Sequence, residues 1–221
     1  MTDTNPGMQI TGKVMQRVRE RFAVDGSGHG IDHIMRVYRM AVRIAEEESC
    51  DTFIVALAAL LHDVGDHKLT ASGNENHREE IAALLDGTGL SDEQIIQITD
   101  IVEKVSFKGN GVEDAPMPVE GRCVRDADRL DAMGSIGIAR AFAYGALKGR
   151  PMFDADQKPA TFDSFSDYKK KNSHTINHFH EKLLLLKDRM ETAAGKRLAE
   201  GRHAMLEAFV SEFLLEWDAE K

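Results

Sequence analysis

Two histidines and two aspartates in this sequence have the chemistry and the positions that a divalent metal site requires. His33 lies near the start of one helical pattern, His62 and Asp63 end the most apolar one, and Asp128 lies in a third. A carboxylate at the end of an apolar helix is costly unless it is paired or bound to a cation. If these helices pack side by side, the mixed nitrogen and oxygen set suits one transition ion and leaves positions open for water and substrate.

Each of these residues, taken alone, has a more ordinary interpretation. A single histidine on a helix is usually a surface residue or a hydrogen-bonded core residue. An aspartate in a run with Asp126 and Asp131 is usually solvated or a helix cap. A His-Asp dipeptide is a short match. Only the combination, in this order and on three helical patterns, favours a metal site.

The elements that must position these side chains are predicted to be helices. Apolar residues recur at the spacing of an amphipathic helix, and no strand alternation is present. The helical segments cover about 11–24, 32–48, 52–63, 76–86, 91–106, 122–133, 137–148, 173–191 and 193–217.

Local signals predict where some of these helices begin and end. Thr11 and Asp51 are expected N-caps, and Ser91 with Gln94 forms a capping-box pattern. Gly87 is expected to end the fourth helix because glycine tolerates the left-handed conformation. Residues 107–121 and 149–172 lack a period and are expected to be loops.

Length and pattern together predict an all-α fold: one helical bundle domain with a helical C-terminal extension. The chain has 221 residues, which suits one large domain. We expect this domain to cover residues 8–221, with its core at about 14–150 and its extension at 173–219. Residues 1–7 are expected to be flexible.

Composition excludes several classes of function. With 28 basic and 37 acidic residues the net charge is −9, which argues against a protein that binds nucleic-acid duplexes. No apolar run approaches the roughly 18 residues of a membrane span, and no secretory signal is visible. We therefore expect no membrane partner and a cytoplasmic location, where Cys50 and Cys123 would be buried, reduced thiols. Both monomer and homodimer remain open.

Five strings carry a resemblance to a known family: His33–Val37 (HIMRV), Leu60–Lys68 (LLHDVGDHK), Ser106–Gly109 (SFKG), Asp126–Ala132 (DADRLDA) and Asn177–Phe179 (NHF). In this order they resemble the HD-domain phosphohydrolase superfamily over about residues 15–215. The similarity is greater to its small bacterial members that act on nucleotides. The resemblance implies an HD-type helical fold with four metal ligands: His33, His62, Asp63 and Asp128.

The resemblance also implies an activity. We expect hydrolysis of (deoxy)nucleoside triphosphates to monophosphate and pyrophosphate, through a water bound to one divalent ion. Manganese is the preferred ion, and magnesium, iron, cobalt, nickel and zinc are also compatible. The alternatives are another phosphoester substrate, either a nucleoside monophosphate or a guanosine-polyphosphate alarmone, or a metal-bearing nucleotide-binding regulatory module without turnover.

Phosphoryl transfer also requires positive side chains around the reacting group. Lys68, six residues after His62, is the first candidate for a catalytic role. Asp66 is similar in position to an acid of relatives that act on guanosine polyphosphates, so it could orient water or protonate the leaving group. The expected substrate-binding residues are Arg36, Lys104, Lys108 and His178.

These assignments have structural alternatives. Lys68 and Lys108 could be ordinary surface lysines, and Arg36 could pair with a carboxylate. Asp66 could only cap a turn. His178 is included because of its place between Asn177 and Phe179, a string that is typical of the narrower group.

Overall fold

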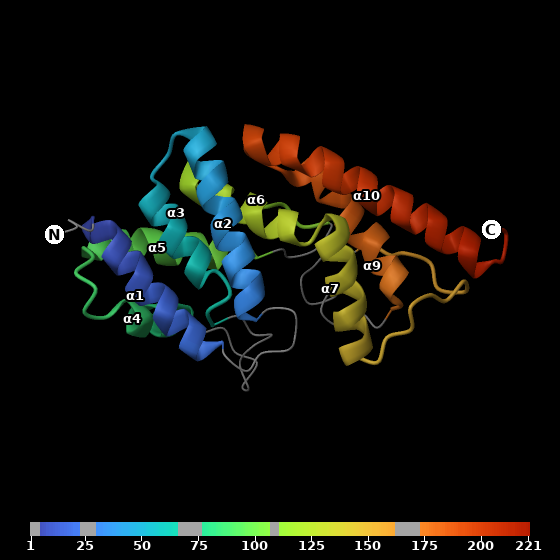
Figure 1. The fold of residues 1–221 in the computed structure, drawn as a ribbon, viewed down its shortest axis with the longest axis horizontal. Helices are drawn as coiled ribbons and strands as arrows, with labels where there is room; N and C mark the ends of the chain where they lie inside the picture. Colours follow the sequence, from blue (N-terminus) through green and yellow to red (C-terminus); the bar gives the residue numbers. More distant parts are fainter. Residues whose placement is uncertain (1–4, 23–29, 66–76, 107–110, 162–172) are drawn as a thin grey trace. The chain divides into compact units, whose positions relative to one another are not determined.

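The computed structural model of the chain describes residues 5–22, 30–65, 77–106, 111–161 and 173–221 (Figure 1). These residues form α-helices and two short 3-10 helices, and none of them lies in a strand, which confirms the all-α prediction. The helices are α1 (Pro6–Arg21), α2 (Ile31–Glu48), α3 (Thr52–Leu61), α4 (His77–Leu85), α5 (Asp92–Val105), α6 (Val119–Asp131), α7 (Gly134–Leu147), α9 (Thr175–Glu181) and α10 (Ala193–Trp217), with η1 (Leu183–Leu185) and η2 (Lys187–Arg189) between the last two.

Contacts divide the chain into two compact units. The N-terminal unit comprises Met1–Ser106 and Pro116–Ala127, and the C-terminal unit comprises Phe107–Ala115 and Asp128–Lys221. The division falls inside helix α6. That the chain forms a single domain stays a prediction.

Helix α3 is the centre of the N-terminal unit. Every residue from Ile54 to Leu61 is buried, and the helix packs against α1, α2 and α5. Helix α2 contributes an apolar face to this core, whose members include Ile34, Val37, Ala41 and Ile44. A helix that is apolar on all sides can exist only where neighbours cover it completely, so the sequence pattern of α3 dictates its central place.

Several predicted caps are confirmed. The Asp51 side chain accepts hydrogen bonds from the backbone N–H groups of Phe53 and Ile54, at 2.9 and 3.2 Å. Ser91 and Gln94 form the reciprocal bonds of a capping box at the start of α5. Gly87, just after α4, has φ of +61°, a conformation that residues with a Cβ rarely adopt.

The predicted start of the first helix is wrong. Helix α1 begins at Pro6, and the Asn5 side chain accepts a hydrogen bond from the Gly7 N–H at 3.0 Å. Thr11 lies inside the helix, where its hydroxyl donates to the Gly7 carbonyl at 2.9 Å. The reason is that Asn is a strong N-cap and Pro is preorganised for the first helical position, and this pair precedes Thr11.

The single long helix predicted over 173–191 is also wrong. Helix α9 ends at Glu181, and two 3-10 helices follow it. Leu183, Leu186 and Met190 are all buried. With three residues per turn, a 3-10 helix places Leu183 and Leu186 on the same side, so the chain keeps both apolar residues in the core by tightening its turn. The amphipathic pattern did not distinguish these two helical forms.

Helix α6 begins at Val119, earlier than the predicted 122 and inside the stretch expected to be a loop. Pro118 precedes it, and the Pro118 carbonyl accepts a hydrogen bond from the Arg122 N–H at 3.1 Å. Proline lacks an N–H and is tolerated only where the helix does not need that donor, at its beginning. The prolines that suggested a loop therefore mark the start of a helix.

The C-terminal unit is built on α10, which packs against α7 and α9. The predicted bounds of α10, 193–217, are confirmed, and the Thr192 side chain caps it by accepting from the Gly195 N–H at 2.9 Å. Aromatic rings from these three helices pack together, with centroid distances of 5.5 Å for Phe179–Phe209 and 5.7 Å for Phe142–Phe209. Aromatic pairs at such distances add packing energy beyond the area they bury.

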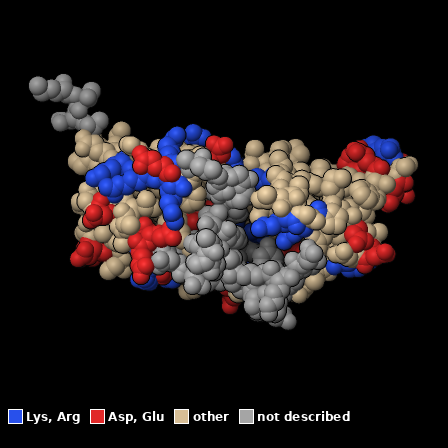
Figure 2. All heavy atoms as spheres, turned by 90° about the horizontal axis from the view of Figure 1, so that it is seen from below, with Lys and Arg blue, Asp and Glu red and all other residues tan. Residues whose placement is uncertain are grey.

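The surface carries charges of both signs. On the face shown in Figure 2, Lys and Arg side chains lie beside Asp and Glu side chains. In the N-terminal unit Arg21 pairs with Glu80 at 2.5 Å, and Arg78 pairs with Glu103 at 2.7 Å. Such exposed pairs contribute little to stability and reduce the local excess of either sign. None of the described helices combines the length and the hydropathy that crossing a membrane requires.

Two basic side chains of α1 bind the C-terminal end of α4. Arg17 donates to the carbonyls of Leu84 and Asp86 at 2.7 and 2.8 Å, and Lys13 donates to the Gly87 carbonyl at 2.8 Å. The last carbonyls of a helix lack partners within it, so these bonds fix α4 against α1.

We expect Arg17→Met to lower the free energy of unfolding by about 1–2 kcal/mol, because it leaves two carbonyls without their charged donor. Urea unfolding measures this difference. Arg19→Met is the matched control on the same helix, since Arg19 is exposed, and it should change stability little. Equal effects of the two substitutions would contradict the role of Arg17.

Candidate metal centre

Helices α2 and α3 place three of the expected ligands. His33 is the third residue of α2 and is 1% exposed. His62 and Asp63 follow the last residue of α3 directly, and they are also buried. Because the apolar faces of α2 and α3 pack together, the start of one helix and the end of the other lie side by side.

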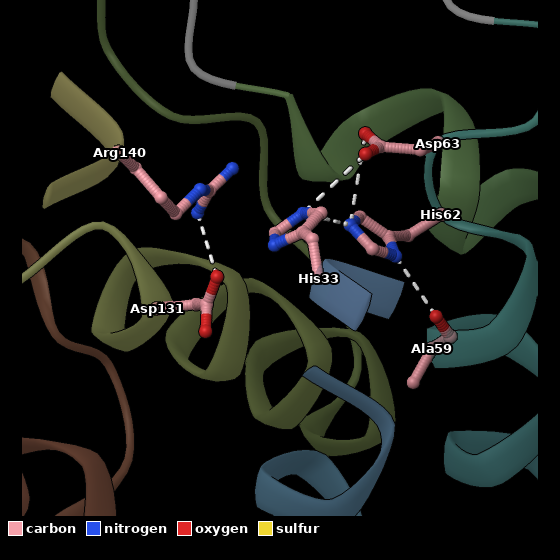
Figure 3. Close-up of polar contacts among 6 residues, drawn as sticks. All are labelled: His33, Ala59, His62, Asp63, Asp131 and Arg140. Carbon is pink, nitrogen blue, oxygen red and sulfur yellow. Dashed lines mark hydrogen bonds and ion pairs between the residues drawn. The ribbon is translucent and has the colours of Figure 1, made fainter. Parts of the chain in front are cut away.

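The side chains of these residues point toward one another (Figure 3). The Nε2 atoms of His33 and His62 are 3.1 Å apart, and their rings are nearly perpendicular, at 68°. Asp63 approaches both rings, with its Oδ2 atom 3.3 Å from Nε2 of His33 and its Oδ1 atom 3.6 Å from Nε2 of His62. Two nitrogens and a carboxylate therefore converge on one point inside the N-terminal unit.

The backbone sets the orientation of the His62 ring. Its Nδ1 atom is 2.8 Å from the carbonyl oxygen of Ala59, one helical turn earlier. A carbonyl only accepts, so Nδ1 carries the proton and, in the neutral ring, Nε2 presents a lone pair. A metal-binding histidine needs this arrangement, in which the second ring nitrogen donates to a fixed acceptor.

Asp128 is the fourth of the expected ligands. One ligand atom from each of His33, His62 and Asp128 lies within 4.8 Å of the others. Asp128 is carried by α6 and follows Ala127, the last residue of the N-terminal unit, within the same continuous helix.

The chemistry of this group fits a divalent cation. Asp63 is 8% exposed, and burial of an ionised carboxylate costs free energy unless a positive charge compensates it. Two imidazole Nε2 atoms at 3.1 Å offer nitrogen ligands in the same place. Mixed imidazole and carboxylate groups are ligands of manganese, iron, cobalt, nickel and zinc.

The other expected site residues lie in different surroundings. Arg36 is half-buried and lies one turn after His33 on the same face of α2. Lys104 is half-buried in the last turn of α5, and its carbonyl accepts a hydrogen bond from Arg125 at 2.8 Å. His178 lies in α9 of the C-terminal unit, half-buried. Asp66, Lys68 and Lys108 lie outside the described residues.

Two contacts went unnoticed in the sequence. The first is the contact between the Ala59 carbonyl and the His62 ring. The position of His62 at the end of the predicted apolar helix is the sequence signal that could have indicated this contact, because a side chain there can reach a carbonyl of the last turn. In the C-terminal unit, Asp131 is buried and forms an ion pair with Arg140 at 2.7 Å (Figure 3). The sequence alone assigns Asp131 no role, because it does not show which distant cation this residue meets.

Comparison with known proteins identifies a family model and relatives that match this chain. The HD domain family model matches residues 30–133, a range that contains all four expected ligands. YpgQ of Bacillus subtilis is 36% identical over 192 residues, covering 85% of this chain and 84% of that protein.

Solved structures agree with this match. A Lactobacillus plantarum protein superposes with a TM-score of 0.86 at 34% identity, over 96% of this chain and 98% of that one. An HD-superfamily hydrolase from Bacillus thuringiensis gives a TM-score of 0.74 at 37% identity, over 96% and 99%. The structure of YpgQ in complex with ADP gives 0.76 at 32% identity, over 95% of each chain.

Proposed function

Because this chain belongs to the HD-domain superfamily, we propose that it is a metal-dependent phosphohydrolase that cleaves (deoxy)nucleoside triphosphates to monophosphate and pyrophosphate. The observation that carries the proposal is the convergence of His33, His62 and Asp63, with Nε2 atoms 3.1 Å apart and a buried carboxylate 3.3 Å from the first ring. These are groups that hold a divalent cation, and hydrolases occur among the similar structures.

The four side chains of His33, His62, Asp63 and Asp128 would hold the ion, with manganese as the preferred metal. When bound, such an ion supplies an activated water at neutral pH and polarises a phosphoryl oxygen. The Ala59 carbonyl keeps the Nδ1 proton of His62 in place, so that Nε2 stays available to the ion. The packed helices α2 and α3 hold the two rings in a fixed geometry, which costs no reorganisation when substrate binds.

Basic side chains would bind the polyphosphate. Arg36 is on the same face of α2 as His33, and its guanidinium can donate two parallel hydrogen bonds to a phosphate. Lys68, Lys104 and Lys108 are the further cationic candidates, and His178 is a candidate contact to substrate. Asp66 would orient the attacking water or protonate the leaving group.

A nucleotide as substrate is supported by one comparison. The structure of YpgQ, a relative over most of the chain, is of a complex with ADP. The same observation favours a second candidate function, a metal-bearing module that binds a nucleotide without turnover. A cytoplasmic location and a monomeric or homodimeric state stay predictions.

A substrate panel with product identification tests the proposal. Protein purified without chelator, supplied with manganese, should release pyrophosphate from nucleoside triphosphates, measured separately from inorganic phosphate. Release of inorganic phosphate from a nucleoside monophosphate would favour another phosphoester substrate, and pyrophosphate from a guanosine-polyphosphate alarmone would do the same. Equilibrium binding of nucleotide with no hydrolysis in any of the six metals would favour the module without turnover.

A further inference from the structure

We propose that Cys50 and Cys123 form an oxidisable dithiol, a modification site whose disulfide joins the turn between α2 and α3 to helix α6. This inference does not depend on the proposed activity. Both cysteines belong to the N-terminal unit, and both are free thiols in the structure.

The geometry brings together two residues that are far apart in the sequence. Cys50 lies in the turn after α2, and Cys123 is the fifth residue of α6, yet their Sγ atoms are 3.7 Å apart. A second contact joins the same two segments, because the Asp51 N–H donates to Oε1 of Glu120 at 3.3 Å. The turn and the helix are thus held together beside the thiols, and the two sulfurs must approach from 3.7 Å to the roughly 2.05 Å of a disulfide bond.

Exposure determines which thiol reacts first. Cys50 is half-buried, whereas Cys123 is fully buried. An oxidant of the small-molecule disulfide class, such as oxidised glutathione, therefore meets Cys50. The Cys50 thiolate attacks one sulfur of the oxidant, breaks its S–S bond and releases one thiol, leaving a mixed disulfide. Cys123 then attacks Sγ of Cys50 and displaces the second thiol, so two protein thiols are oxidised, one disulfide is reduced, and the two protons end on the released thiols.

The surroundings of the thiols make this oxidation slow at neutral pH. Burial raises the pKa of the Cys50 thiol, and the carboxylates of Glu120 and Asp51 raise it further. Burial also raises the pKa of Cys123 well above its ordinary value. The thiolate is the attacking species, so the pair remains reduced without a disulfide oxidant and reacts faster in alkaline solution.

The acidic neighbours of Cys123 act in the same direction. Glu48 and Asp126, together with Cys50 itself, raise the pKa of Cys123. The charged groups that raise the pKa of the two thiols are all acids, and raising the pH increases the thiolate at both positions.

The disulfide would change the unfolded chain more than the folded one. It would close a ring from residue 50 to residue 123, and a long closed loop reduces the entropy of the unfolded chain. We expect the oxidised protein to unfold at a temperature about 5–10 °C higher than the reduced protein. The cross-link also ties down α6 five residues before Asp128, the expected metal ligand on that helix.

Mass spectrometry of the oxidised full-length protein tests the proposal. The folded chain is incubated with oxidised glutathione at about pH 8.5, where more thiolate is present, then acidified, unfolded and alkylated with N-ethylmaleimide. We expect a monomer that has lost two hydrogens and carries neither glutathione nor maleimide, with a peptide linking Cys50 to Cys123. Persistent glutathione on Cys50, two alkylated cysteines, or a disulfide between two chains would each overturn the proposal.

Single variants identify the order of the steps. Cys123→Ala should stop at the mixed disulfide on Cys50, and Cys50→Ala should leave Cys123 unreacted because that thiol is buried. If a variant does not fold, the mass of the oxidised wild-type protein still shows whether the disulfide forms. Calorimetry should show the rise in unfolding temperature only for oxidised wild type, reversed by dithiothreitol. A disulfide that forms without this rise would overturn the proposed tether between the turn and α6.

Discussion

We expect the replacement of Asp63 by asparagine to lower kcat/KM for the substrate of the proposed reaction by at least about 1000-fold. A bound divalent ion supplies several kcal/mol of transition-state stabilisation, and about 1.4 kcal/mol corresponds to a factor of ten. Asparagine keeps the volume of Asp63 but removes the negative charge that approaches both imidazole rings, at 3.3 and 3.6 Å. Steady-state kinetics with manganese measures the loss.

Two further measurements make this result specific to the site. The helical circular-dichroism signal of Asp63→Asn should remain that of wild type, since the substitution keeps the side-chain volume. Asp92→Asn is the matched control, because Asp92 is exposed in the first turn of α5, and it should keep kcat/KM within about twofold. Activity within tenfold of wild type in a folded Asp63→Asn protein would remove Asp63 from the catalytic site.

We expect manganese, added at about 1000 times its dissociation constant, to raise the free energy of unfolding by about 4 kcal/mol, which corresponds to a rise of about 8–16 °C in Tm. The reason is that the ion would bind the converged side chains of the folded state and would find no such arrangement in the unfolded chain. Differential scanning calorimetry of metal-free protein, titrated in turn with each of the six candidate metals, measures the rise and ranks the ions.

A pair of histidine variants shows where the ion binds. His62→Gln should lose most of the metal-dependent rise in Tm, because glutamine lacks the imidazole nitrogen that would bind the ion. This loss is expected whatever the stability of the metal-free variant. His203→Gln should keep the full rise, since His203 lies on α10 and pairs with Glu207 at 3.2 Å. Equal metal-dependent shifts in both variants would place the stabilising ion elsewhere.

The sequence predicted the helices best where one local signal was sufficient. Asp51 and the Ser91–Gln94 pair determine helix starts through bonds to their own backbone, so reading a few neighbouring residues suffices. The residues 173–191 show the limit of this approach. An amphipathic pattern there is compatible with an α-helix or with 3-10 turns, and burial of Leu183 and Leu186 in the tertiary structure decides between them.

The same limit applies to the candidate metal site, where the residue types could be predicted and the distances between them could not. The residue types of His62 and Asp63, at the end of a fully apolar helix, were enough to indicate a buried group that needs compensation. Their distances to His33 come from the packing of α2 against α3, which no local pattern specifies. The partner of Asp131 could not be predicted either, because Arg140 meets it through the path of the chain between α6 and α7.

Helix α3 is buried among its own neighbours, and the expected metal ligands His62 and Asp63 directly follow its last residue. Single substitutions in such a helix are poorly tolerated, since several neighbouring helices must accommodate each change of side chain at once. Relatives that act on other substrates are thus expected to keep helix α3 with the His-Asp pair at its end and to differ in the segments around them. Changes of substrate are therefore expected in the segments around the candidate site, and substitutions within α3 are expected to be rare.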